Sequence, residues 1–328
     1  PRMFGLTRAA YLWMISRMPR LWKWMYEVSD RRNMAEKPVR GIAPVERLLE
    51  RLLREWKPDA VVCTYMVYPY MLDSLASCTG RAVPYLTVVT DSFVINKSWL
   101  CSKSPLWAVT DPWTRAIMEE KGLPQDRLRV TGFPVNPVLG ALAKEHPLSW
   151  KEGEPFRVLY FAQRSARHAR AELAGMLDAN PALHVTCILG RRFRRIYPRI
   201  RDLRARYGRR LTVRGWTRRV PSYLAASHVV VGKAGGATVH EVLAAARPML
   251  VNFLLPGQEE GNTRLLEKLG GGSHVPDARA LASALQEMMA DGGAQWRRMH
   301  ENLLRAGMTG GSGRIADLAL KLAEEHTN

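Results

Sequence analysis

One stretch of the chain, residues 229–262, constrains the fold more than any other. It reads as an apolar strand, a glycine-rich turn, an amphipathic helix and a second apolar strand in direct succession. A strand–helix–strand unit of this kind predicts two neighbouring parallel strands joined by a right-handed crossover. The parts are the strand Val229–Val231, the turn with Gly232, Gly235 and Gly236, a helix that begins near Thr238, and the strand Pro248–Phe253.

The glycine-rich turn also predicts an anion site. The first N–H groups of a helix have no partner within the helix, and the helix dipole is positive there. We therefore expect the backbone at Gly235, Gly236 and Thr238 to bind a diphosphate, with Lys233 assisting. An exposed structural lysine is the alternative for Lys233. Glu241, one turn into the helix, suits the hydroxyls of a ribose, the alternative being an ordinary carboxylate on a helix face.

The turn differs from the common nucleotide-binding fingerprints. The sequence GKAGGA lacks the G-x-G-x-x-G order, and no Walker lysine follows the glycines. A simple glycine turn between a strand and a helix is therefore an alternative interpretation. The exit of the second strand favours a ligand site, because polar side chains follow it at the carboxyl end of a parallel strand. We expect Gln258 and Glu259 to hold sugar hydroxyls, the alternative being a solvated turn.

The same segment resembles a known family. The elements K-A-G-x-x-T, E-x-L and P-G-Q-E-x-G-N occur in the order and spacing typical of monogalactosyldiacylglycerol synthases and processive diacylglycerol glucosyltransferases. These are inverting GT-B glycosyltransferases related to the peptidoglycan enzyme that adds N-acetylglucosamine to lipid I. The resemblance extends upstream through three further segments: Arg214–Trp216, Val130–Val135 and Val88–Asp91.

The resemblance implies a fold, an activity and a set of site residues. The fold is α/β, two Rossmann-like doubly wound domains that face a cleft. The activity is metal-independent transfer of a hexose from a UDP-sugar to a lipid, with diacylglycerol as the acceptor. Gly215 and Trp216 then belong to the donor site with Asn262, and Trp216 stacks on the base unless it packs in the core. Asp91, at the end of a strand, is the candidate base, and helix capping is the alternative.

Two departures from the family stand out. The family has a first strand, a glycine-rich loop with a histidine and a helix before the region at which this chain opens. We therefore expect either a shortened N-terminus or a divergent relative with low activity. The family also has a glycine-rich loop after the strand at Phe161, where this chain has Arg164 and Ser165. Their side chains are candidates for contacts to phosphate or to the acceptor.

Alternation of strands and helices occurs twice along the chain and predicts two parallel sheets. A proline-rich segment, Phe133–Pro147, separates the two series, so we expect an acceptor and membrane-side domain over 1–146 and a UDP-sugar domain over 147–328. The predicted strands are Ala60–Cys63, Tyr85–Thr90, Trp107–Thr110 and Leu128–Thr131, then Arg157–Phe161, His184–Leu189 and Leu211–Arg214.

The formal net charge of +19 predicts an anionic partner. Thirteen arginines and one acid lie between Arg191 and Arg219, and the first forty residues hold nine basic and three acidic residues beside several Trp and Tyr. Basic and aromatic residues together are typical of a bilayer interface. We expect peripheral binding to the cytoplasmic membrane face, the alternative being an ordinary amphipathic helix pair over Leu6–Tyr26.

Other functions remain open on sequence grounds. Transfer of N-acetylglucosamine to a polyprenyl-linked acceptor is the nearest alternative, and a GT-B sugar-nucleotide epimerase lacks supporting residues. A nucleic-acid-binding protein without enzymatic activity would explain the arginines, but no ordered aromatic platform accompanies them, so we expect no nucleic acid. No Asp-x-Asp pair and no His/Cys cluster is present. We therefore expect neither a metal nor a cofactor beside the UDP-sugar substrate.

Overall fold

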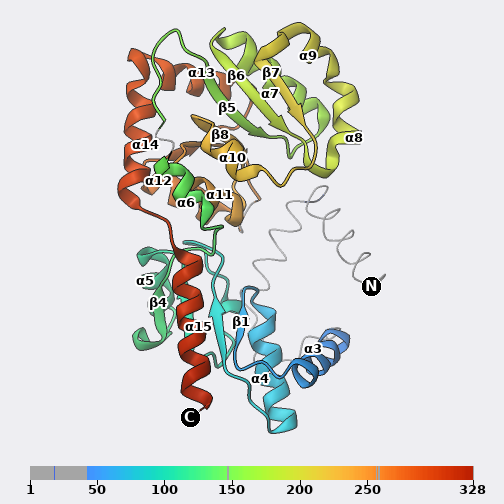
Figure 1. The fold of residues 1–328 in the computed structure, drawn as a ribbon, viewed down its shortest axis with the longest axis vertical. Coiled ribbons are helices and arrows are strands. Elements are labelled where there is room, and N and C mark those ends of the chain that lie inside the picture. Colours follow the sequence, from blue (N-terminus) through green and yellow to red (C-terminus); the bar gives the residue numbers. More distant parts are fainter. Residues whose placement is uncertain (1–17, 19–42, 146–147, 256, 258, 328) are drawn as a thin grey trace. The chain divides into compact units, whose positions relative to one another are not determined.

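The computed structural model describes residues 18, 43–145, 148–255, 257 and 259–327, and Figure 1 shows their fold. The chain forms two compact units. The first contains Pro1–Pro134, Leu255–Gly261 and Gly310–Asn328, and the second contains Val135–Leu254 and Asn262–Thr309. Each unit has a parallel sheet with helices packed on it, as the alternating pattern predicts. The predicted helix pair Leu6–Tyr26 lies outside the described residues except for residue 18.

The sheet of the first unit has four parallel strands in the order β1-β2-β3-β4. Helix α5 begins after Asp111, whose carboxylate accepts a hydrogen bond from the Thr114 N–H at 2.8 Å, and Pro112 fits the first helical position. The elements are β1 (Val61–Cys63), β2 (Tyr85–Val88), β3 (Leu106–Val109), β4 (Leu128–Val130), α3 (Ala43–Trp56), α4 (Val67–Thr79), α5 (Pro112–Glu120) and α15 (Gly311–Thr327).

The C-terminal helix packs on this first sheet rather than on the second (Figure 1). Ile315 and Leu322 of α15 are buried against Leu86 and Val88 of β2. The unit also includes Gly261, where a Cβ would lie only 1.8 Å from the Ser92 oxygen. The division therefore differs from the single boundary expected near residue 146. The chain leaves the first unit at Pro134. It returns to this unit twice, with the segments Leu255–Gly261 and Gly310–Asn328.

The sheet of the second unit has six parallel strands in the order β10-β9-β8-β5-β6-β7. Its strands are β5 (Phe156–Phe161), β6 (Leu183–Ile188), β7 (Leu211–Arg214), β8 (Val229–Lys233), β9 (Met249–Phe253) and β10 (Gly272–His274). The predicted strands match β5 to β9 within two residues. Sequence reasoning missed β10, whose three residues carry no apolar run.

Helices cover both faces of this second sheet. On one face, α7 and α13 bury a core that includes Val158, Tyr160, Leu173 and Leu285. On the other, α6 packs against α10 and α11. Their bounds are α6 (Val138–Glu145), α7 (Ala166–Ala179), α8 (Phe193–Ile196), α9 (Arg201–Tyr207), α10 (Val220–Ala225), α11 (Gly236–Ala244), α12 (Glu260–Lys268), α13 (Ala278–Met289) and α14 (Ala294–Ala306).

The strand order places the switch point of the second sheet between β5 and β8. The chain moves from β5 toward β7 in one direction, then returns to β8 on the other side of β5. Loops that leave the carboxyl ends of two such strands diverge, and ligands bind in the crevice between them in open α/β sheets. The loops that begin after Phe161 and after Lys233 flank this point.

Candidate active site

The turn after β8 presents an uncapped helix end. Gly235 is the N-cap of α11, in extended conformation, and no side chain of a described residue caps the helix. Side chains do cap α5, α7 and α13: those of Asp111, Ser165 and Asp277. The first N–H groups of α11, at Gly236 and Thr238 among others, are therefore left for a ligand or solvent. Lys233 ends β8 at this turn and is half-buried.

Glu241 is half-buried on the first turns of α11. Burial raises the pKa of its carboxyl group, because the charged form loses hydration. A carboxylate of this kind gains a partner when hydroxyl groups approach it. The position of Glu241 behind the anion-binding turn therefore suits a ribose.

Asn262 fixes the shape of the same turn. Its Nδ2 donates a 3.0 Å hydrogen bond to the carbonyl oxygen of Ala234, and the residue is 2% exposed. Its Oδ1 is buried with no hydrogen-bond partner among the described residues. The side chain thus joins α12 to the loop between β8 and α11, so the structure gives it a positioning contact with that loop.

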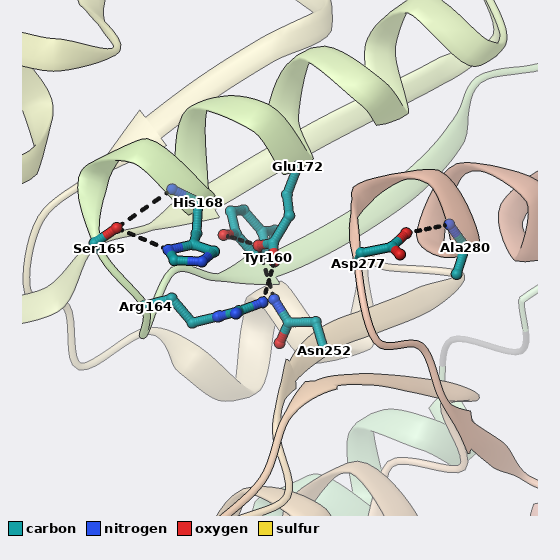
Figure 2. Close-up of polar contacts among 8 residues, drawn as sticks. All are labelled: Tyr160, Arg164, Ser165, His168, Glu172, Asn252, Asp277 and Ala280. Atoms are coloured by element: carbon teal, nitrogen blue, oxygen red, sulfur yellow. Dashed lines mark hydrogen bonds and ion pairs between the residues drawn. The ribbon is translucent and has the colours of Figure 1, made fainter. Parts of the chain in front are cut away.

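Arg164 lies after β5, held over a buried carboxylate (Figure 2). Its Nη1 is 3.6 Å from Oε1 of Glu172, and its guanidinium lies 5.9 Å from the ring centre of Phe253. Glu172 is 2% exposed, and its Oε2 accepts hydrogen bonds from Tyr160 and, at 2.8 Å, from Asn252. The ion pair is buried on the glutamate side, while the arginine side chain is one quarter exposed.

Ser165 has a structural contact in this conformation. Its Oγ caps the N-terminus of α7 through the His168 N–H and lies 2.8 Å from His168 Nδ1 (Figure 2). Burial and the nearby Arg164 lower the pKa of His168, so its imidazole is more readily neutral. Of these two candidates for contacts to phosphate or to the acceptor, Arg164 is therefore the better placed to meet an anion.

Trp216 is a surface residue. It is 59% exposed, and the guanidinium of Arg218 lies 5.6 Å from its ring centre. Core packing, the alternative interpretation, therefore does not describe this side chain. Gly215 precedes it, and a Cβ at that position would lie 3.6 Å from the side chain of Phe193. An exposed indole that follows β7 is available to stack on a planar ligand.

Asp91 follows the second strand of the first unit. Trp99 Nε1 donates a 2.8 Å hydrogen bond to its Oδ2. Burial raises the pKa of Asp91, the Trp99 hydrogen bond lowers it, and the nearby charge of Glu259 raises it. The helix cap at α5 is supplied by Asp111, so Asp91 does not cap that helix. Sequence reasoning missed two neighbours of Asp91, namely Trp99 and Tyr65. The charge of Asp91 contributes to raising the pKa of Tyr65.

The two residues predicted to hold the sugar differ in their settings. Glu259 is 4% exposed, and its Oε2 accepts a 3.0 Å hydrogen bond from the Leu255 N–H. This burial and the bond to Leu255 show that the side chain is not part of a solvated turn. Gln258 lies outside the described residues.

The described residues contain neither a cluster of metal ligands nor a helix that could cross a membrane. No group of three or more His, Cys, Asp or Glu side chains within them could hold a metal ion. No helix among them has the length and apolar character needed to cross a bilayer.

Comparisons with known proteins agree with this architecture. Residues 3–135 match the model of the monogalactosyldiacylglycerol (MGDG) synthase family, and residues 175–311 match the C-terminal domain of glycosyltransferase family 28. A processive diacylglycerol beta-glucosyltransferase of Staphylococcus carnosus (strain TM300) is 25% identical over 252 residues. That match covers 75% of this chain and 63% of the relative, so the chain spans less than two thirds of that protein.

Solved structures show the same fold. The MurG protein of Acinetobacter baumannii has a TM-score of 0.61 at 15% identity, over 85% of this chain and 78% of that one. A UDP-GlcNAc 2-epimerase from Neisseria meningitidis, bound to UDP-GlcNAc, has a TM-score of 0.63 at 14% identity, over 87% and 83%. Likeness of fold alone therefore does not distinguish transfer from epimerisation.

Two parallel α/β units with an uncapped helix at the switch point of the second define a GT-B protein. The family models that match residues 3–135 and 175–311 indicate which GT-B proteins the chain resembles. In both halves the chain is similar to the monogalactosyldiacylglycerol synthase and processive diacylglycerol glucosyltransferase group.

Proposed function

We propose that the protein transfers a hexose from a UDP-sugar to diacylglycerol, with inversion and without a metal ion. The observation that carries the proposal is the uncapped N-terminus of α11 with the half-buried Glu241 one turn behind it. The family matches to both halves and the name of the Staphylococcus carnosus relative support it. Both halves of the chain thus favour glycolipid synthesis over epimerisation.

The donor would bind to the second unit through its diphosphate and ribose. Backbone N–H groups at Gly236 and Thr238, together with the Thr238 hydroxyl and Lys233, would stabilise the diphosphate as its charge grows in the transition state. Glu241 would accept hydrogen bonds from the ribose, and Trp216 would cover the base. Gln258 and Glu259 remain candidates for the sugar hydroxyls.

Arg164 would replace the backbone donors of the family's glycine-rich loop. The ion pair with Glu172 and the ring of Phe253 hold its guanidinium in one orientation, and a quarter of the side chain faces outward. An arginine fork suits the paired oxygens of a phosphate. A side chain that is already held in place loses less conformational entropy when it binds a ligand. This supports a role for Arg164 in place of the backbone N–H groups of the family's loop.

Asp91 would act as the base on the acceptor side. Its raised pKa brings the carboxylate closer to the range in which a base works near neutral pH. As the acceptor oxygen attacks the anomeric carbon, its proton passes to Asp91. The bond from that carbon to the UDP oxygen breaks, and UDP leaves with the electron pair. A single displacement of this kind inverts the anomeric configuration.

The location that fits this substrate is a peripheral one on the cytoplasmic face of a membrane. Diacylglycerol resides in a bilayer, and the basic character of the chain favours an anionic surface. No helix among the described residues could span the bilayer, so within them the contact with lipid would be made at the surface.

The test is transfer of labelled sugar into vesicles that contain diacylglycerol, with UDP-glucose, UDP-galactose and UDP-N-acetylglucosamine compared as donors. We expect a neutral glycolipid product of inverted configuration. Transfer only to a polyprenyl-linked acceptor would replace diacylglycerol by the nearest alternative. Interconversion of UDP-sugars with no lipid product would contradict transfer altogether.

A nucleic-acid-binding function is the alternative from another class, and thermal unfolding distinguishes the two. A ligand that binds only the folded state raises the melting temperature by mass action. We expect UDP to raise it and RNA to leave it nearly unchanged at physiological salt. A rise with RNA alone would favour the alternative.

A further inference from the structure

A cationic pocket of about 310 Å³ lies at the amino-terminal edge of the second sheet. Among its lining residues, Arg157 and His184 are neighbours on β5 and β6, and Thr186 and Thr212 are neighbours on β6 and β7.

The lining of this second-unit pocket is cationic and rich in hydroxyl groups. Arg157, Arg209 and Arg210 contribute guanidinium groups, and His184, Thr186 and Tyr223 add an imidazole and two hydroxyls. None of the described residues that line it is acidic. The side chains of β5, β6 and β7 that line it alternate with those buried against α7 and α13, so they lie on the opposite face of the sheet.

The hydrogen bonds that Arg157 and Arg210 donate to described residues leave their positive charges in place. Arg157 donates a 2.6 Å hydrogen bond to the Ala226 oxygen, and Arg210 donates to the oxygens of Leu177 and Asn180, which are uncharged acceptors. Burial lowers the pKa of His184, and the charges of Arg210 and Arg157 lower it further. The imidazole therefore lies in a positive field that an anion would relieve.

We propose that this pocket binds the phosphate group of a small phosphorylated molecule or of a phospholipid headgroup. Guanidinium forks and hydroxyl groups are the donors that suit phosphate oxygens. The site is distinct from the donor edge. Arg157 is the second residue of β5 and Phe161 is its last. At about 3.3 Å per residue, the two lie roughly 13 Å apart along the strand.

The experiment measures binding with the donor site filled. Calorimetry in saturating UDP uses glycerol 3-phosphate as the soluble probe. Sedimentation compares vesicles of phosphatidylcholine alone with vesicles of phosphatidylcholine mixed with phosphatidic acid. Arg209→Gln is expected to weaken binding about tenfold, the scale of a lost charged hydrogen bond, and Thr186→Val about threefold. Arg204→Gln, an exposed arginine outside the pocket, is the control of equal charge.

Each outcome bears on the proposal. Weakening by both pocket variants, with the control unchanged, supports it, and the probe that responds identifies the soluble or the lipid source. A rise in the pKa of His184 when the probe binds, followed by NMR, would support it further. No binding of either probe, equal weakening by Arg204→Gln, or binding that UDP abolishes would overturn it. Because UDP fills the donor site throughout, failure here leaves the proposed transferase function untouched.

Discussion

Trp99 donates its indole N–H to Oδ2 of Asp91 over 2.8 Å. This contact fixes one carboxylate oxygen and leaves the other for a second partner. Burial and the charge of Glu259 raise the pKa of Asp91, whereas the indole hydrogen bond opposes that rise. The pair therefore sets both the orientation and the proton affinity of the candidate base.

Asp91→Asn should lower the rate of sugar transfer by about 10²–10⁴-fold, the usual loss when a general base is removed. UDP affinity should change little. Steady-state rates and calorimetry with UDP measure the two effects separately. An unchanged rate would exclude Asp91 as the base.

Trp99→Phe should move the acid limb of the pH–rate profile to higher pH. The base works only when it is deprotonated, so activity falls as the pH falls through its pKa. Loss of the indole N–H removes a contact that lowers this pKa, so the pKa should rise. The profile of kcat/KM against pH is the measurement, and a shift to lower pH would contradict the assignment.

Glu241→Ala should weaken UDP binding by roughly 1–3 kcal/mol, the scale of a hydrogen bond to a charged group. Glu287→Ala, at an exposed position of α13, is the matched control. Because burial raises the pKa of Glu241, UDP binding should also weaken as the pH falls through that raised value. Calorimetry that finds equal UDP affinity in both variants would remove Glu241 from the site.

Two glycine substitutions in the first unit should have opposite effects on stability. In Gly261→Ala the new Cβ would meet the Ser92 oxygen at 1.8 Å, so we expect a loss of about 1–3 kcal/mol or more. Gly313 has open space around it on α15, so Gly313→Ala should gain up to about 1 kcal/mol from helix propensity. Urea unfolding measures both, and equal effects would show that the contact at Gly261 relaxes freely.

Removal of divalent cations should leave UDP-sugar binding and transfer unchanged. The proposed site stabilises the diphosphate with backbone N–H groups and cationic side chains. Binding and transfer with and without EDTA test this, and magnesium added back is the control. Loss of transfer in EDTA that magnesium restores would refute the metal-independent mechanism.

Anionic vesicles should bind the protein more tightly than neutral ones, and salt should weaken the binding. Attraction amounts to about 1 kcal/mol per basic residue near the surface. Replacing the lysines and arginines before Arg40 by glutamine should reduce binding more than the same change around Arg201. The reverse ranking, measured by sedimentation, would place the membrane contact on the second unit.

Much of the fold is encoded locally. Apolar runs bounded by turn residues predict β5 to β9 because strand formation at a buried position depends on side chains a few residues apart. The glycines between Gly232 and Gly236 likewise predict the turn before α11, and the motifs of this segment carry the resemblance to a glycosyltransferase family. These features depend on residues that are neighbours in the sequence, so the sequence determined them by itself.

Tertiary structure decided how distant residues meet. Trp99 reaches Asp91, Asn252 reaches Glu172 across 80 residues, and α15 packs on the first sheet, although no local pattern relates these pairs. The exposure of Trp216 and the burial of Glu259 likewise depend on what the rest of each unit covers. The physical reason is that burial and long-range hydrogen bonds follow from the packing of whole elements, whereas periodicity and turn chemistry act within a few residues.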